Sequence, residues 1–169
     1  ISYLHKEDHD TPLEETIGAY ADLMRAGKVR YIGVSNHRAW RVAEIVRICR
    51  DLGINPPVIS QPYYNAMNRM PEVEHLPACG HFGIGVFPYS PMARGVLSGK
   101  YEPGKPPPEG TRAGVNDARM MQSEWREESL VIAQTLKAHA EKQGITAGQF
   151  AVAWVLNNKL VTGTIAGPR

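Results

Sequence analysis

The sequence lacks the features that mark three large classes of protein. It holds only two cysteines in 169 residues, too few for a disulfide framework and without metal-site spacing, so we expect Cys49 and Cys79 to be buried free thiols. No run approaches the roughly 18 apolar residues of a membrane span. The net charge is only +2, with no lysine and arginine cluster to suit nucleic acid. We therefore expect a cytoplasmic globular protein that binds no metal, membrane or nucleic acid.

The sequence does contain an ordinary globular composition, with 43% apolar and 21% charged residues. This composition suits one domain over residues 1–169, or a large part of one. Ile1 opens directly inside an apparent strand, and Arg169 closely follows another. We expect the sequence to be part of a longer protein.

Buried strands that end in polar residues recur along the chain. Residues 29–36 (V-R-Y-I-G-V-S-N) are apolar on both sides of the backbone, as in a parallel sheet covered by helices, and then end in Ser35 and Asn36. The other strands that we expect end in the same way and lie at residues 1–4, 57–60, 84–88 and 161–166. The first four strand ends lie about 26 to 30 positions apart, the length of one strand, one helix and two loops. This pattern predicts an α/β fold with a parallel sheet.

In a barrel of such units the loops after the strands open on one face, so polar residues at successive strand ends converge on one site. We expect one constellation made of His5, Ser35, Asn36, Gln61, Tyr89 and Gly167. Tyr63 and Tyr64 follow the third strand end. They either line the same pocket or pack at the mouth of the barrel.

Two helix starts carry the pattern of a capping box. In T-P-L-E at residues 11–14, the Thr11 hydroxyl would accept from the backbone N–H of Glu14. In T-A-G-Q at residues 146–149, Thr146 and Gln149 would cap each other in the same way. We expect one helix to begin near residue 12 and another near residue 146.

Residues 89–101 (Y-S-P-M-A-R-G-V-L-S-G-K-Y) are too irregular for a helix and too polar for a core strand. Their hydroxyls and glycines, with Arg94 and Lys100, suit a loop folded around a phosphate-bearing ligand. The next segment, residues 102–128, begins rich in proline, glycine and charge. Because it leaves from the face on which the strands end, we expect a mobile lid rather than an inert surface loop.

A series of motifs resembles the aldo-keto reductase family across essentially all 169 residues. The segment R-Y-I-G-V-S-N at residues 30–36 fits a family signature whose next position is normally Phe or Tyr, and here is His37. This departure leaves Ser35 and Asn36 intact and puts the neighbouring pocket lining in question. The further matches, in family order, are Y-L-H at 3–5, S-Q at 60–61, P-Y-S-P at 88–91, R-G-V-L-S-G-K-Y at 94–101 and I-A-G-P-R at 165–169.

The resemblance implies a (β/α)8 TIM barrel, of which this chain would be a partial barrel covering roughly strands 4 to 8. It also implies a nicotinamide dinucleotide across the C-terminal face, usually NADPH (NADP+ when oxidised). Ser35, Asn36 and Gln61 would hold the nicotinamide carboxamide, and Tyr89 would stack on the ring. The ribose and pyrophosphate would be wrapped by Ser90, Pro91, Met92, Arg94, Gly95, Leu97 and Lys100. The adenosine phosphate side would be met by Gly167 and Arg169.

The resemblance further implies that His5 is the histidine of the family's catalytic tetrad, which orients the substrate carbonyl and stabilises charge on its oxygen. The alternative is a structural histidine bonded to a backbone group. A zinc motif does not fit H-K-E-D-H at residues 5–9, because Lys6 follows the first histidine and the helix begins only near residue 12. In the family the catalytic Asp, Tyr and Lys precede this sequence, so we expect the chain alone to be inactive.

These features leave three functions open. The first is an NADPH-dependent oxidoreductase that reduces small aldehydes or ketones to alcohols by hydride transfer. The second is an NADPH-binding regulatory subunit with little turnover, because similar barrels act as auxiliary subunits of ion channels. The third is an unrelated barrel enzyme for a phosphorylated substrate. The particular carbonyl compound is left open, as is a homo-oligomer formed through the exposed strand edges of a partial barrel.

Overall fold

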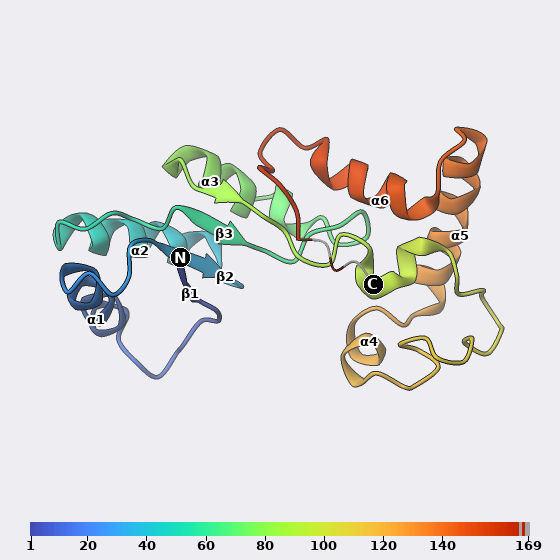
Figure 1. Cartoon of the computed structure of the whole chain (residues 1–169), viewed down its shortest axis with the longest axis horizontal. Helices are drawn as coiled ribbons and strands as arrows, with labels where there is room; N and C mark the ends of the chain where they lie inside the picture. Colours follow the sequence, from blue (N-terminus) through green and yellow to red (C-terminus); the bar gives the residue numbers. More distant parts are fainter. Residues whose placement is uncertain (166, 168–169) are drawn as a thin grey trace.

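The structure is a computed structural model that describes residues 1–165 and residue 167 (Figure 1). In chain order its elements are β1 (Ser2–Leu4), α1 (Leu13–Arg25), β2 (Ile32–Ser35), α2 (Ala39–Asp51), β3 (Ile59–Gln61), the 3-10 helix η1 (Met70–Glu72), α3 (His75–Phe82), β4 (Gly85–Val86), the 3-10 helix η2 (Ala93–Ser98), α4 (Ala118–Ser123), α5 (Glu127–Lys142) and α6 (Ala147–Leu156). Strands alternate with helices as far as β4, which confirms the predicted α/β class. Among the described residues, no helix is long and apolar enough to cross a membrane.

The strands form one parallel sheet of four, in the order β1-β2-β3-β4. Val34 of β2 lies opposite Leu4 of β1 on one side and opposite Ser60 of β3 on the other. All four residues of β2 are buried, as the apolar pattern of residues 29–36 predicts for its central part. Within residues 1–165 and 167 the sheet stays open and does not close into a barrel.

The prediction of a fifth strand at residues 161–166 is wrong for residues 161–165, the part of it that the structure describes. This segment runs beside β4 without forming a regular ladder. The N–H groups of Thr162 and Gly163 both donate to the Val86 carbonyl, at 2.9 and 3.3 Å, and the Thr162 hydroxyl accepts from the Val86 N–H at 3.1 Å. The Thr162 hydroxyl thus takes the place of a backbone carbonyl as the acceptor for Val86. The regular series of backbone hydrogen bonds of a parallel ladder is therefore lost.

Two hydrophobic clusters hold the chain together. The sheet cluster lies between the strands and α1 to α3 and includes Leu4, Ile17, Ile32, Val34, Val42, Ile45, Val46, Ile48, Cys49, Leu76, Cys79 and Val86. The distal cluster consists of Ala93, Val96, Leu97, Tyr101, Ala113, Met120, Leu130, Ala133 and Ala151. Helix α6 belongs to both, because Val155 packs in the first cluster and Ala151 in the second. Figure 1 shows the elongated result, with β1 to β3 toward one end and α4 and α5 toward the other.

Both cysteines are free and buried in the sheet cluster, which confirms their prediction as buried thiols. Burial raises the pKa of the Cys49 thiol and of the Cys79 thiol to about 11. Because the thiolate is the reactive form, neither side chain is a nucleophile near neutral pH.

One of the two predicted capping boxes forms. At the start of α6 the Thr146 hydroxyl accepts from the Gln149 N–H at 3.2 Å, and the Gln149 side chain accepts from the Thr146 N–H at 2.9 Å. The capping box at Thr11 is wrong, because the N-cap of α1 is Pro12 and no side chain caps it. The N–H of Thr11 is instead turned toward the Asp8 carboxylate, 3.3 Å away.

Residues 102–128, called the lid segment below, are attached to the body of the protein. Residues 102–117 consist of turns and irregular segments, and α4 follows them. Asp117 caps α4 by accepting from the Met120 N–H at 2.8 Å. Ala113 and Met120 are both buried in the distal cluster, so the segment packs at two points along its length. Whether it opens and closes stays a prediction.

Close packing in the sheet depends on the absence of a side chain at Gly33 of β2. A Cβ atom there would lie 2.7 Å from Cγ2 of Ile59 and 2.8 Å from Cε1 of Tyr3. Side chains on both neighbouring strands would have to move to admit a methyl group. Gly18 in α1 is the opposite case, because a Cβ atom at that position meets nothing within 4 Å.

We predict that Gly33→Ala lowers the free energy of unfolding by about 1–3 kcal/mol, the usual cost of overpacking. Gly18→Ala should raise it by about 0.5–1 kcal/mol, because alanine restricts the unfolded chain and favours helix. Urea unfolding of both variants measures the two effects. Equal changes in the two variants would contradict the packing described for β2.

Candidate functional site

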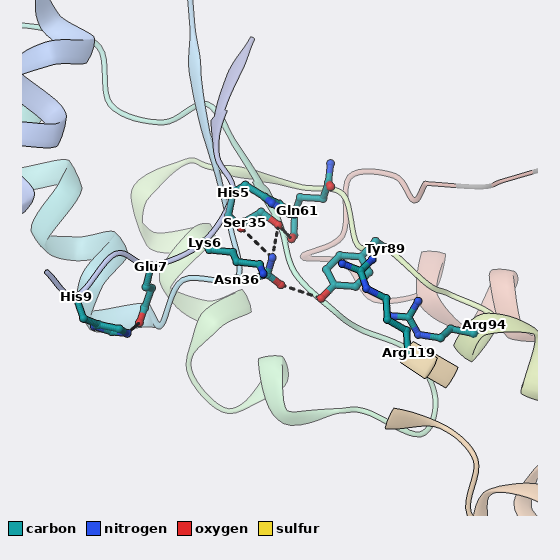
Figure 2. Close-up of a pocket in the computed structure, with 10 residues that line it drawn as sticks. All are labelled: His5, Lys6, Glu7, His9, Ser35, Asn36, Gln61, Tyr89, Arg94 and Arg119. Carbon is teal, nitrogen blue, oxygen red and sulfur yellow. Dashed lines mark hydrogen bonds and ion pairs between the residues drawn. The ribbon is translucent and has the colours of Figure 1, made fainter. Parts of the chain in front are cut away.

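Four strand ends converge on one pocket. His5 directly follows β1, Ser35 and Gln61 end β2 and β3, and Tyr89 lies after β4. With Asn36 they line a pocket of about 510 Å³ (Figure 2). The parallel register brings these ends level, since Ser35 lies opposite Gln61. The structure thus gathers five of the six residues predicted to form a constellation.

Asn36 is the centre of a hydrogen-bond network at these strand ends. Its amide nitrogen donates to the His5 carbonyl at 2.9 Å and to the Ser35 hydroxyl at 3.1 Å. Its amide oxygen accepts from the Tyr89 hydroxyl at 2.8 Å. Ser35 Oγ in turn donates to the Gln61 carbonyl at 2.7 Å. The network holds the Asn36 amide in one orientation and links residues from all four strand ends.

The backbone around the pocket enters the left-handed region at several residues other than glycine. The φ angle is 55° at Asn36, 56° at Ser90, 45° at Ala93 and 55° at Arg94. Asparagine tolerates this conformation, but it is uncommon for the other three residues. Such conformations cluster at functional sites, where the surrounding structure holds them. Ser90, Ala93 and Arg94 form the sharp turns after Tyr89 that place Arg94 on the pocket wall.

The ring of Tyr89 has one face covered. It stacks on Tyr63 with ring centroids 5.4 Å apart and planes inclined by 26°. Burial is the main cause that raises the pKa of the Tyr89 hydroxyl, so this group stays protonated and donates to Asn36 at neutral pH. Because Tyr89 also lines the pocket, its second face is the one available to a flat ring.

Positive side chains outnumber carboxylates on the pocket wall. Lys6, Arg94 and Arg119 line it, together with Glu7. Figure 2 shows Arg94 and Arg119 next to each other beside the Tyr89 ring. Two guanidinium groups from η2 and α4 at one end of a pocket suit a phosphate or diphosphate group.

The other predicted cofactor residues lie elsewhere. Those that do not line this pocket are Ser90, Pro91, Met92, Gly95, Leu97, Lys100 and Gly167. Leu97 is buried in the distal cluster, and the Lys100 ammonium lies 5.2 Å from the centre of the Tyr101 ring. Gly167 is exposed, and Arg169 lies outside the described residues. Their cofactor contacts stay predictions.

Four residues of the pocket wall have no role predicted from the sequence. Lys6, Glu7 and His9 follow the first strand end, so the rule that selects His5 could have included its successors. Arg119 has no such signal, because it lies in the lid segment far along the chain. His9 Nε2 is 3.6 Å from the Glu7 carboxylate. In the part of the chain that the structure describes, no three His, Cys, Asp or Glu side chains are placed to hold a metal ion.

Comparison with known sequences decides the family. The sequence model of the Aldo/keto reductase family matches residues 1–169. The chain belongs to the aldo/keto reductase family. Membership implies a (β/α)8 barrel, whose repeating unit is a parallel strand followed by a helix, as in β1 to α3. That this aldo/keto reductase chain covers strands 4 to 8 stays a prediction.

The relatives of this aldo/keto reductase chain include proteins named as reductases and proteins named as potassium channel subunits. Mouse aflatoxin B1 aldehyde reductase member 2 is 37% identical over 173 residues, which cover 97% of the chain and 47% of the relative. Human aldo-keto reductase family 7 member A3 is 43% identical over 102 residues, 60% of the chain and 31% of the relative. A probable voltage-gated potassium channel subunit beta of rice is 32% identical over 168 residues, 99% of the chain and 51% of the relative. The chain spans about half the length of the first and third of these relatives.

Two histidines are packed behind the strand ends, and one of them is His37. Its Nδ1–H donates to the Ser35 carbonyl at 2.7 Å, so the proton of the neutral ring is on Nδ1. Nε2 of His75 lies 2.7 Å from the Ser60 hydroxyl. Burial is the main cause that lowers the pKa of both rings. Both rings are therefore neutral in the folded protein at neutral pH.

We predict that the folded protein loses stability as the pH falls below 6.5, the ordinary pKa of histidine. The unfolded chain takes up protons there, whereas the folded chain takes them up only at lower pH, so acid favours unfolding. His37→Phe should make the free energy of unfolding, measured in urea from about pH 7 to pH 5, less dependent on pH. His9→Gln, which changes an exposed ring, is the control. An unchanged pH dependence in His37→Phe would contradict the assignment.

Proposed function

We propose that the protein is an NADPH-dependent oxidoreductase that reduces small aldehydes or ketones to alcohols. The observation that carries this proposal is the meeting of Asn36, Gln61 and Tyr89 on one pocket beside His5. The family to which the chain belongs, and relatives named as aldehyde reductases, support it. The substrate is proposed to be a small carbonyl compound.

The nicotinamide carboxamide fits the polar groups at the strand ends. A carboxamide needs a donor and acceptors close to one plane. The Asn36 amide oxygen accepts one hydrogen bond from Tyr89 and has a second lone pair to offer. The side-chain amide of Gln61 makes no hydrogen bond within residues 1–165 and 167, so it offers both a donor and an acceptor. Asn36 and Gln61 are thus proposed to bind the carboxamide, with Ser35 holding Asn36 in place.

The remainder of the cofactor fits the other side of the pocket. The free face of Tyr89 would stack on the nicotinamide ring. Arg94 and Arg119 would bind the pyrophosphate, and Lys6 lies on the same wall. Preference for NADPH over NADH is proposed from the family resemblance. Because Arg119 comes from α4, the proposed site also gives the lid segment a role in covering the cofactor.

His5 is exposed at the end of β1 and lines the pocket. Its backbone carbonyl accepts from Asn36, which leaves the ring to orient a substrate carbonyl and to stabilise charge on its oxygen. Bound NADPH would supply the hydride. The resemblance places the tetrad's general acid outside these 169 residues, so we propose that they bind cofactor without reducing carbonyls by themselves.

A second candidate is an NADPH-binding auxiliary subunit with little turnover. The similarity to a probable potassium channel subunit beta, which extends over 99% of this chain, favours it. Both candidates use the same cofactor pocket. Oxidation of NADPH by an added aromatic aldehyde, in a protein that includes the family's tetrad, separates them, because only the oxidoreductase should turn over repeatedly.

We predict that the chain binds NADPH and that Gln61→Ala weakens binding about tenfold, since one hydrogen bond to the carboxamide is lost. Tyr89→Ala should weaken it at least as much through loss of stacking. Gln143→Ala, which changes an exposed glutamine outside the pocket, should bind as wild type. Titration of cofactor fluorescence measures the three dissociation constants. Absence of any fluorescence change with the wild-type chain would contradict the proposed function.

A further inference from the structure

A buried carboxylate of the lid segment lies behind the pocket. Glu124 is only 4% exposed, although glutamate is rarely buried without a partner. It accepts a hydrogen bond from the Tyr63 hydroxyl. Its carboxylate also lies 3.9 Å from Nε of Arg94, whose side chain is 18% exposed. A buried charge is costly without partners, and here two partners from different segments compensate it.

These contacts extend directly to the pocket wall. Tyr63 covers one face of the Tyr89 ring, and Arg94 lines the pocket itself. The backbone N–H of Tyr89 donates to the Pro62 carbonyl at 3.0 Å, so the two stacked tyrosines are also joined through the main chain. At its far end the Tyr89 ring is held by its hydrogen bond to Asn36. These supports of the Tyr89 ring all come from the strand-end segments.

Glu124 is the support that comes from elsewhere, because it follows α4 and is far from Tyr63 along the chain. The Tyr63 hydroxyl can donate one hydrogen bond, and the Glu124 carboxylate accepts it. Burial, and then this hydrogen bond, raise the pKa of the Tyr63 hydroxyl, so the phenol remains a donor at any physiological pH. The ring on which Tyr89 stacks is thus bonded through its hydroxyl to a residue of the lid segment.

We propose that Glu124 is a positioning residue for the cofactor pocket, which acts through Tyr63 to fix the ring of Tyr89. This inference rests on the proposed function, in which Tyr89 stacks on the nicotinamide ring. It gives the lid segment a specific role in forming the pocket. With Glu124 in place, the Tyr63 hydroxyl has its acceptor and the stacking surface for Tyr89 is formed. Glu124 itself does not touch the cofactor.

The test compares NADPH binding in Glu124→Ala, Glu124→Gln and Tyr63→Phe. Glu124→Ala should raise the dissociation constant about tenfold, because it removes the acceptor from the Tyr63 hydroxyl. Glu124→Gln should restore most of the affinity, since its amide oxygen can accept the same hydrogen bond. Tyr63→Phe keeps the stacked ring and loses only the hydroxyl, so it should weaken binding about threefold. Glu128→Gln, an exposed carboxylate of α5, is the matched control.

Two further measurements separate positioning from a structural role. At saturating NADPH, Glu124→Ala should change the circular dichroism of the nicotinamide absorption band, because the ring lies at a different angle on Tyr89. A loss of stability alone would leave the band of the bound, folded protein unchanged. The double variant Tyr63→Phe/Glu124→Ala should bind no more weakly than Glu124→Ala, since both changes break the same contact.

The outcomes distinguish this inference from the proposed function. If wild type binds NADPH while Glu124→Ala shows the wild-type affinity and dichroism, the positioning role is wrong and the proposed function stands. If Glu124→Ala is impaired but Tyr63→Phe is not, Glu124 acts through Arg94 and the proposed route is wrong. If Glu124→Ala does not fold, Tyr63→Phe still decides, because wild-type affinity and a wild-type band in that variant would overturn the inference. If wild type itself binds no NADPH, both proposals fail.

Discussion

The site depends on the level ends of parallel strands. Side chains that follow neighbouring strands in register leave the sheet at the same edge, which is why residues separated by tens of positions meet at Asn36. The hydrogen bonds from Asn36 to His5, Ser35 and Tyr89 then convert this proximity into a defined arrangement. Gly33 permits it, because a side chain at this position would collide with Tyr3 and Ile59 on the two neighbouring strands.

The local sequence carried the information that placed the centre of the pocket. The hydrophobic pattern alone predicts a buried strand followed by small polar residues. The spacing of about 30 residues between successive strand ends indicates that the strands are parallel. His5, Ser35, Asn36, Gln61 and Tyr89 were found in this way. The same rule failed at residues 161–165, where the Thr162 hydroxyl replaces a backbone acceptor. The capping pattern at Thr11 also failed. A sequence pattern does not show that the N–H groups of Asp10 and Thr11 donate to the Asp8 carboxylate instead.

The support of the pocket was not predictable, for a different physical reason. Arg119 and Glu124 lie in a segment without periodicity, and their importance arises only from contacts made across the fold. A buried glutamate is indistinguishable in sequence from a solvated one. The family motifs at the strand ends do not supply these residues either, since none of those motifs lies in the lid segment. Tyr63 is an intermediate case, because its place after Gln61 suggested either the pocket or packing, and it proves to form the support beneath Tyr89.

The most direct test of the central claim is a crystal structure of the chain with NADP+. The account predicts the nicotinamide ring against the face of Tyr89 opposite Tyr63, with the carboxamide within hydrogen-bonding distance of the side chains of Asn36 and Gln61. A nicotinamide ring bound away from these strand ends, or on a surface that does not include Tyr89, would contradict it.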